Sequence, residues 1–418
     1  MSGARQNHRL APWRRALPGV TLALLFTCPA GAQATDWEAS LDMRLVNSDA
    51  DRSYMSGGLG SVRFDRDDAP LELGRARFAF THTLAQIWSV HLDASMWDDK
   101  DAHPVGITEA YLQFRPYPRS GYRLRVKAGA FYPPVSLENR ASGWESPYTL
   151  SYSAINSWLA TEVRTIGAEA QLDWLGSRTG HVFDVGVTCA VFGWNDSAGA
   201  VLAGDGFVLT DRQTPLGGRV GQPGMQPLNG IKPFLEIDGR PGAYAGLEAR
   251  YLDRLVVRVL RYDNRADPGE VNSVAGVVAW HTTFTSAGVR LESPGGWTLI
   301  AQWLDGTTEI DPHGFAAAWP YRAGFGLISR QFGRHTLSAR YDRFWIDATA
   351  QEADGTQSGH ALTAAYAFEA GAHWRVSLEW LQVVSDSYNR QELYGLPPLT
   401  TQTQVQLAVR YAIGSNMP

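Results

Sequence analysis

The stretch WEASLDMRL, residues 37–45, determines the fold class of this chain. Every second residue of it is apolar, and the residues between are polar or charged. This period of two is typical of a β-strand with one apolar face. Four more segments repeat the pattern, and all their outward positions are apolar; they cover residues 88–96, 122–130, 374–380 and 405–413. The regularity indicates strands whose outer face meets a uniformly apolar surrounding.

The 418 residues contain sixteen such segments, many of which reach the ~9 to 11 residues of a tilted membrane-spanning strand. They lie near residues 36–46, 72–82, 87–97, 105–116, 121–131, 162–174, 181–194, 243–252, 254–264, 281–293, 296–305, 321–332, 334–347, 358–369, 371–385 and 401–413. Short turns alternate with long loops along the chain. The pattern predicts an all-β fold, a closed transmembrane antiparallel β-barrel with short turns and both termini on the periplasmic side.

Aromatic side chains gather where the predicted strands meet the short turns. Outward positions of this kind include Trp37, Trp88, Trp174, Trp297 and Trp374. Trp and Tyr are enriched where a membrane protein crosses the membrane–water interface. An ordinary aromatic core would spread them along the strands, so their placement favours an interfacial girdle.

The first 34 residues have the organisation of an export signal. Four arginines lie between Arg5 and Arg15, an apolar core covers residues 16–26, and small residues at 32–34 form a cleavage site. We therefore expect a signal peptide at 1–34, a barrel domain at 35–418, and a location in the outer membrane of a Gram-negative cell.

Composition and motifs argue against several function classes. Cleavage of the signal removes four of the 37 basic residues and leaves 33 against 42 acidic ones, a net charge of −9, which disfavours nucleic acid as a partner. Cys28 lies in the signal, so Cys189 remains alone and forms neither an intrachain disulfide nor a cysteine-based zinc site. Motifs of metalloproteases, serine hydrolases and P-loop enzymes are missing. We expect no cofactor, no metal and no enzymatic activity.

The segment after the fifth predicted strand resembles a known family. KAGAFYPPVSLEN at 127–139, followed by RTIGAE at 164–169, is similar to the phosphate-selective porin O and P family. The resemblance implies a trimeric outer-membrane porin for small anions. It also implies that Gly129, Pro134, Ser136, Glu138 and Gly167 shape the third external loop and its return to the wall. The chain departs from the pattern of outer-membrane barrels at its end, where five residues follow position 413 in place of a terminal aromatic residue.

Two external loops are too long for simple hairpins. Residues 132–161 carry bulky side chains that prefer burial. We expect this loop to fold into the lumen and to place Glu138, Arg140 and Glu145 at the narrowest point, with a short helix at 151–159; the alternative is a packed surface loop. The loop at 195–242 is rich in Gly and Pro, and we expect it to cap the external mouth or fold inward.

Inward-facing basic residues on consecutive strands are predicted to line the pore and bind anions. They are Arg75, Arg77, Arg115, Arg123, Arg125 and Lys127. Like charges in a narrow pore of low dielectric lower the energy of a passing anion. The alternative is a lumen of paired charges with weak selectivity, because the inward positions also include acids such as Asp93, Glu169 and Asp173.

These features predict a porin in outer-membrane lipid that lets small hydrophilic solutes diffuse passively and prefers anions such as phosphate, with a homotrimer implied by the resemblance alone. A substrate-selective channel for small carboxylates or sugars stays open as an alternative. Inward aromatics, Tyr111, Tyr244, Tyr262 and Phe344, are expected to form no continuous stripe, which disfavours a sugar channel. An outer-membrane barrel enzyme is a third and less favoured interpretation.

Overall fold

The computed structural model describes residues 34–97, 104–118, 120–223, 230–272, 277–349 and 355–415. The expected signal peptide lies outside the described residues except for its last position. Its cleavage therefore stays a prediction.

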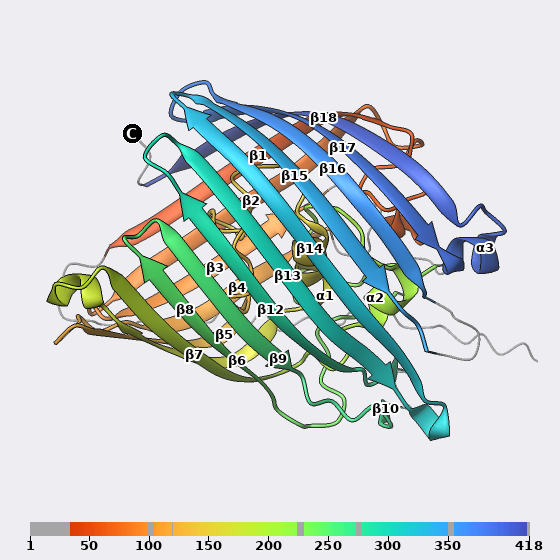
Figure 1. Ribbon diagram of the computed structural model, residues 1–418, viewed down its shortest axis with the longest axis horizontal. Coiled ribbons are helices and arrows are strands. Elements are labelled where there is room, and N and C mark those ends of the chain that lie inside the picture. Colours follow the sequence, from red (N-terminus) through yellow and green to blue (C-terminus); the bar gives the residue numbers. More distant parts are fainter. Residues whose placement is uncertain are drawn as a thin grey trace, which may run out of the picture.

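Sixteen strands close into one antiparallel barrel, in which β1 pairs with β2 on one side and with β18 on the other (Figure 1). The strands are β1 (Thr35–Ser48), β2 (Leu71–Leu84), β3 (Trp88–Met96), β4 (Val105–Phe114), β5 (Tyr122–Phe131), β6 (Thr165–Trp174), β7 (Phe183–Gly193), β8 (Gly242–Tyr251), β9 (Leu255–Asp263), β12 (His281–Glu292), β13 (Trp297–Ile310), β14 (Ala317–Phe332), β15 (His335–Ile346), β16 (Gln357–Glu369), β17 (Trp374–Ser387) and β18 (Leu399–Gly414). The sixteen-stranded barrel predicted from the sequence is confirmed.

Short helical and strand elements lie in the connections. They are the helices α1 (Ala154–Glu162), α2 (Ala200–Asp205) and α3 (Tyr388–Tyr394), the 3-10 turns η1 (Tyr54–Ser56), η2 (Gly176–Thr179) and η4 (Pro312–Gly314), and a two-stranded sheet of β10 (Val271–Asn272) and β11 (Val277–Val278). No helix among the described residues is both long enough and apolar enough to cross a membrane.

Predicted and observed boundaries differ by three residues or more at β6, β13, β14 and β17. β6 begins at Thr165 instead of residue 162, because α1 continues up to Glu162. β13 continues to Ile310 and β14 starts at Ala317, so this hairpin extends past the predicted ends at residues 305 and 321. The sequence pattern ended early there because the added outward residues of β13, Thr307 and Glu309, are polar, and because the added part of β14 contains Pro320, which cannot donate to a strand ladder.

Turns at one end of the barrel are tight and those at the other end are long (Figure 1). The β8–β9 turn shows how tightness is achieved: Leu252 and Asp253 have φ angles of 49° and 54°. Two successive positive φ values define the type I′ geometry whose twist matches antiparallel strands. We call the two ends the short-turn end and the long-loop end.

The outer face is apolar along most strands, as the alternation predicted. On β7, Phe183, Val185, Val187, Cys189 and Val191 are exposed while the residues between them are buried. Outward aromatics stand at the short-turn end, where Trp37, Trp88, Trp297 and Trp374 are exposed. This placement agrees with the expected girdle.

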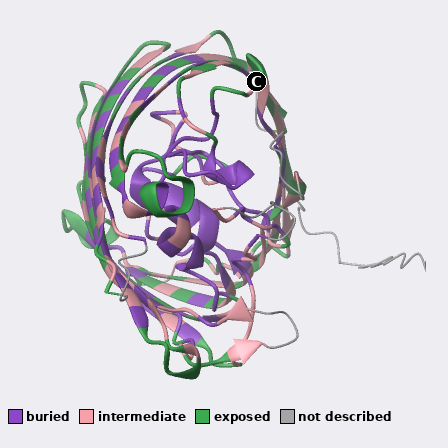
Figure 2. Ribbon diagram, turned by 90° about the vertical axis from the view of Figure 1, so that its right-hand side faces the viewer, coloured by how far each residue is buried: buried purple, intermediate pink, exposed green. Residues whose placement is uncertain are grey.

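The inside of the barrel is filled by chain from the long-loop end. Figure 2 shows buried helices and loop segments within the ring of strands. They belong to the 132–161 loop with α1 and to the 195–242 loop with α2, whose described residues are mostly buried. The prediction that the third external loop folds into the lumen is confirmed.

Candidate functional site: the lumen and its constriction loop

Arg340 of β15 binds the 132–161 loop, which we call the constriction loop, to the barrel wall. This fully buried guanidinium donates to Asp342 beside it on β15 and to Glu138 of the loop, each at 2.7 Å. It also donates to the backbone carbonyls of Ser151 and Tyr152, at 2.7 and 2.9 Å. A guanidinium offers five donors in a fixed fork, which suits such a convergence of acceptors.

Two carboxylates of the wall accept from the loop backbone. Glu379 of β17 receives the amide hydrogens of Leu150 and Ser151, at 2.6 and 3.0 Å. Asp342 receives the amide of Ala154 at the first turn of α1, at 3.0 Å. These bonds satisfy amides that a loop crossing the lumen would otherwise leave without partners. These hydrogen bonds to the wall therefore fix the loop across the lumen.

The 195–242 loop packs against the constriction loop through Glu162. The Glu162 carboxylate accepts from the amides of Val201 and Leu202 at the start of α2, at 2.7 and 3.0 Å, and from the Trp158 indole at 2.8 Å. Burial raises the pKa of Glu162 to about 7, although these hydrogen bonds oppose the shift. Burial also raises the pKa of Asp205, the last residue of α2, and the nearby Glu162 raises it further.

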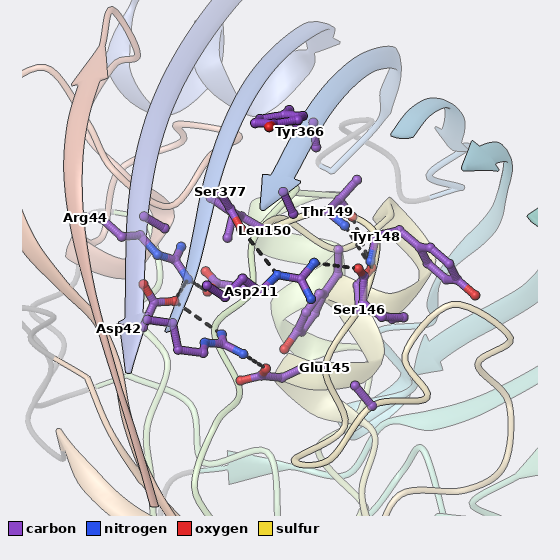
Figure 3. A pocket seen from close by; sticks show the side chains of 18 residues that line it. Asp42, Arg44, Glu145, Ser146, Tyr148, Thr149, Leu150, Asp211, Tyr366 and Ser377 are labelled. Atoms are coloured by element: carbon purple, nitrogen blue, oxygen red, sulfur yellow. Dashed lines mark hydrogen bonds and ion pairs between the residues drawn. The ribbon is translucent and has the colours of Figure 1, made fainter. Parts of the chain in front are cut away.

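A cluster of opposite charges joins both loops to β1 and β18. Figure 3 shows Asp42, Arg44, Glu145 and Asp211 around a cavity of about 80 Å³. Arg44 donates to Asp42 at 2.9 Å and to Asp211 of the 195–242 loop at 2.6 Å, while Arg410 binds Glu145.

Electrostatics inside this cluster keep the loop carboxylates ionised. Burial by itself would raise the pKa of Glu145, but Arg410, Arg75 and Arg77 outweigh it and lower the pKa to about 2. Arg44 and Arg63 likewise hold the pKa of Asp211 below its usual range against the effect of burial. The charges are thus mutually compensated.

The predicted constriction residues fall into different surroundings. Glu138 is fully buried in its ion pair with Arg340. Glu145 is buried between Arg75, at 2.9 Å, and Arg410. Arg140 is the most exposed of the three, and its side chain binds Glu292 of β12. Of the three, only Arg140 borders the wide cavities of the lumen.

The predicted basic patch divides into two groups and one separate residue, Arg115. Arg75 and Arg77 are buried under the constriction loop, where Arg77 contacts Asp93 at 2.6 Å. Arg123, Arg125 and Lys127 of β5 face acids or amides of β6; their partners are Asp173 at 2.8 Å, Gln171, and Glu169 at 2.9 Å, respectively. Arg115 follows β4 at the short-turn end, and within the described residues its side chain forms no ion pair.

A wide cavity lies between the constriction loop and the wall formed by β4 to β9 and β12. Its volume is about 610 Å³. The lining carries six basic residues and two acidic ones; the basic ones are Arg125, Lys127, Arg140, Arg250, Arg258 and Arg290, and the acidic ones are Glu169 and Glu248. Arg140 also borders a second cavity of about 540 Å³ near the short-turn end. Positive charge therefore predominates in the lining of the first cavity, whereas the second has two basic residues, Arg140 and Arg375, and two acidic ones, Glu292 and Glu369.

Sequence reasoning missed Arg250, Arg258 and Arg290. All three occupy the inward face of strands that were predicted, on β8, β9 and β12. The alternation that identifies Arg123 as inward also identifies these three, but they lie beyond the 195–242 loop and so are not on strands consecutive with the predicted patch. Arg258 donates to Glu248 at 2.7 Å and to the carbonyls of Pro134 and Ser136, both at 3.0 Å.

Inward aromatics contact one another and rings of the two loops in a belt, whereas the sequence led us to expect no continuous stripe. Tyr262 stacks on Phe284 with ring centroids 4.7 Å apart, and Phe284 contacts Trp158 of α1 at 5.4 Å. Phe207 of the 195–242 loop lies between Tyr321 and Phe344, with its ring centroid 6.3 and 5.7 Å from theirs, respectively. The belt was invisible in the sequence because loop residues complete it. These rings are buried beneath the loops, so they offer no open slide to a sugar.

One group of carboxylates among the described residues is close enough to share a cation. Oxygens of Asp196, Glu236 and Asp238 lie within 4.8 Å of one another. Each carboxylate already accepts a loop amide, from Ile237, Trp194 and Arg240, at 2.6, 2.7 and 2.7 Å, respectively. These hydrogen bonds explain the cluster as a group of carboxylates that stabilises the conformation of the 195–242 loop.

A closed barrel of sixteen antiparallel strands with a loop folded into its lumen has the fold of outer-membrane porins. The chain is similar to the outer-membrane channel DcaP of Acinetobacter baumannii, with a TM-score of 0.54 and 9% identity over 91% of this chain and 97% of that one. It is similar to OmpT of Vibrio cholerae in its trimer form, with a TM-score of 0.53 and 10% identity over 92% and 100%. Salmonella typhi OmpF in complex with daunomycin gives 0.51 and 10% over 91% and 97%.

At these identities the likeness shows the fold alone. No protein-family model and no curated protein matches the chain. The resemblance of residues 127–169 to the phosphate-selective porin O and P family thus has no family match behind it.

The sequence led us to expect no enzymatic activity, but the comparisons do not allow such activity to be excluded. The matched structures include OmpT of Vibrio cholerae in several forms, at 9 to 10% identity. The expectation rested on missing local motifs, whereas a barrel can bring catalytic side chains together from distant strands. The fold leaves catalysis open.

Proposed function

We propose that this protein is an outer-membrane porin that lets small hydrophilic solutes diffuse passively, with a preference for anions such as phosphate. The observation that carries the proposal is the 610 Å³ cavity, whose lining has six basic and two acidic residues. Cations in a narrow space bounded by protein attract anions and repel cations. Arg125, Lys127, Arg140, Arg250, Arg258 and Arg290 would form the anion-attracting wall.

Hydrogen-bonding capacity supports an anionic solute. The Nε atoms of Arg125 and Arg290 are buried without a hydrogen-bond partner among the described residues. Both residues border the cavity, and an arginine fork matches the oxygens of phosphate and carboxylate. The earlier patch contributes Arg125 and Lys127 to this wall, whereas Arg75 and Arg77 are neutralised under the loop.

We further propose a homotrimer, exported through cleavage of residues 1–34. The matched OmpT structure is of a trimer form. The outer surface also differs between the two halves of the barrel: the fifth outward residue from the short-turn end is exposed and apolar on several strands of the first half, as at Leu45, Met96, Val105 and Val191. On the second half the same rung carries Asp263, Asp305, Arg343 and His360. A taller apolar band suits contact with another subunit.

The test is the zero-current potential of the purified protein in a planar bilayer under a tenfold chloride salt gradient, repeated with phosphate. An anion-selective potential that phosphate reduces is expected. In the variant Arg125→Gln/Arg258→Gln, selectivity should move toward cations. Arg178→Gln, an exposed arginine in the η2 turn outside the lumen, is the matched control and should behave as wild type.

Each result has a distinct meaning. A cation-selective wild type would disprove the anion preference and keep the channel. Conductance that saturates with one carboxylate or sugar would favour the substrate-selective alternative. No conductance from folded protein would disprove the porin itself.

A further inference from the structure

A basic patch stands on the outer surface of the barrel near the long-loop end. It comprises Arg322 of β14, Arg343 and Trp345 of β15, and His360 of β16, and we call it the Arg322–Arg343 patch. The guanidinium carbons of Arg343 and Arg322 lie 4.9 and 6.0 Å from the centroid of the Trp345 ring. An Nη1 atom of Arg343 lies 3.4 Å from Nδ1 of His360.

The patch lies at the outer edge of the apolar band. On β15 the outward residues that precede Arg343 from the short-turn end are His335, Leu337, Ala339 and Tyr341. Eight residues of a tilted strand rise about 20 Å, close to the ~25 Å height of the apolar band of such barrels. Arg343 therefore reaches the level of lipid headgroups.

The positive charge of the patch is only partly compensated. Arg322 contacts Asp347 at 2.9 Å and lies opposite Asp305 of β13 in the strand register. In the described part of the chain, no carboxylate oxygen lies within 4.0 Å of Arg343. Arg322 and Arg343 thus share one indole ring, and Arg343 has no carboxylate partner among the described residues. An additional anion would stabilise this arrangement.

The surface next to the patch is apolar and continuous with it. Tyr341 and Leu362 are paired in the register of β15 and β16, directly below Arg343 and His360, and both are exposed. Trp303 of β13 adds a ring 6.0 Å from Trp345. A ligand seated on the cations would therefore rest the remainder of its body on hydrocarbon-facing side chains. A free anion in water would use only the cations.

We propose that the Arg322–Arg343 patch binds the phosphate of an outer-leaflet glycolipid, whose acyl chains lie along Tyr341 and Leu362. The inference rests on the proposed outer-membrane location. It also requires that the long-loop end of the barrel faces the outer leaflet. Guanidinium forks recognise phosphate bidentately, and basic residues at the membrane surface recognise anionic headgroups. Trp345 holds the two forks side by side.

The test uses purified protein in neutral detergent micelles and measures binding of bis-phosphorylated lipid A by quenching of tryptophan fluorescence. Arg322→Gln/Arg343→Gln should weaken binding by about tenfold or more. The matched control is Arg330→Gln: Arg330 is also outward on β14 and lies 4.9 Å over the Trp297 ring, but at the short-turn end. That control should keep wild-type affinity. Far-UV circular dichroism verifies that each variant is folded.

Three further arms decide the outcome. Dephosphorylated lipid A should bind wild type as weakly as lipid A binds the double variant. Inorganic phosphate at equal concentration should not displace lipid A, and displacement would overturn the lipid assignment in favour of a free anion. Equal binding by wild type and the double variant would overturn the patch. Conductance of the same samples is measured separately, so loss of lipid binding with an intact channel refutes this inference and not the porin.

Discussion

The two sides of the lumen are built on different principles. Along β12 to β17 many inward side chains are fully buried against the loops; they include apolar ones such as Phe284, Tyr321 and Phe344 and the ion-paired Arg340. Along β5 to β9 the inward residues that border the open 610 Å³ cavity include six charged ones, Arg125, Lys127, Glu169, Glu248, Arg250 and Arg258. One side is therefore a seat for the constriction loop, and the other side is the wet wall that a solute would pass.

The comparison teaches that lipid and lumen constrain the chain unequally. Lipid meets every outward position in the same way, so the outer face is apolar around most of the barrel. The lumen imposes no uniform rule: where a loop packs on a strand, the inward residues are apolar or bind polar groups of the loop, as Arg340 and Glu379 do, and where a cavity remains many of them are charged. Rigidity should consequently belong to the seat, and selectivity to the wet wall.

The largest expected effect comes from removing the anchor of the seat. Arg340→Ala leaves Glu138 and Asp342 buried without their cation, and breaking a buried pair in this way costs about 3–5 kcal/mol. We expect a large drop in the thermal unfolding temperature in detergent, measured by circular dichroism, and noisier single-channel currents as the loop loosens. Arg178→Ala in the exposed η2 turn is the control and should change stability little. Equal stability of the two variants would mean that the loop does not depend on Arg340.

A pH dependence should follow from Glu162, which lies where the two loops meet. Its pKa is about 7 in the folded protein against 4.5 for an ordinary glutamate. Between these values the unfolded chain is ionised while the folded protein keeps the proton, so stability falls as pH rises through this window, by on the order of 3 kcal/mol. Glu145 and Asp211 have lowered pKa values and act only at more acidic pH.

The measurement is the unfolding temperature of wild type and Glu162→Gln between pH 5 and pH 7. We expect the decline to be smaller in Glu162→Gln, because Gln cannot ionise. Glu270→Gln, an exposed glutamate, should decline as wild type does. A parallel decline in all three proteins would contradict the assignment.

The sequence allowed the wall of this protein to be predicted almost completely. A period of two with an apolar outer face is a local signal, and lipid enforces it on each strand separately. Segments such as WEASLDMRL therefore identified their strands without knowledge of their neighbours. The tight and long turns supplied the order of the strands around the barrel.

The lumen could be predicted only in part, because its contacts join residues far apart in the chain. Glu138 was identified as important to the loop, but its partner Arg340 lies 202 residues away. The sequence predicts Arg75 as a pore-lining cation, but in the structure Glu145 of the 132–161 loop covers Arg75 and pairs with it. Aromatic residues on β12 to β15 could not be recognised as a belt without Trp158 and Phe207 from the two loops.

A finer comparison of seat and lipid face uses one methylene group. Ile155 of α1 is fully buried in the seat, and Ile155→Val should cost about 0.5–1.5 kcal/mol because the packed loop leaves a small void. Ile328→Val removes the same group on the outward face of β14, where lipid can fill the space. Urea unfolding in lipid vesicles should show the larger loss for Ile155→Val. The reverse order would place the looser packing in the lumen.

The smallest expected change in stability belongs to the wet wall. Lys127 is paired with Glu169 at 2.9 Å and its side chain is 21% exposed, so Lys127→Gln should cost less than about 1 kcal/mol. The same substitution leaves the Glu169 carboxylate, which Tyr244 also contacts at 2.6 Å, facing the cavity without its cation. Anion selectivity in a bilayer should fall measurably although folding is intact. Lys127→Arg keeps the charge and should restore the wild-type potential, whereas a loss of selectivity in both variants would assign Lys127 to packing and not to the field that solutes meet.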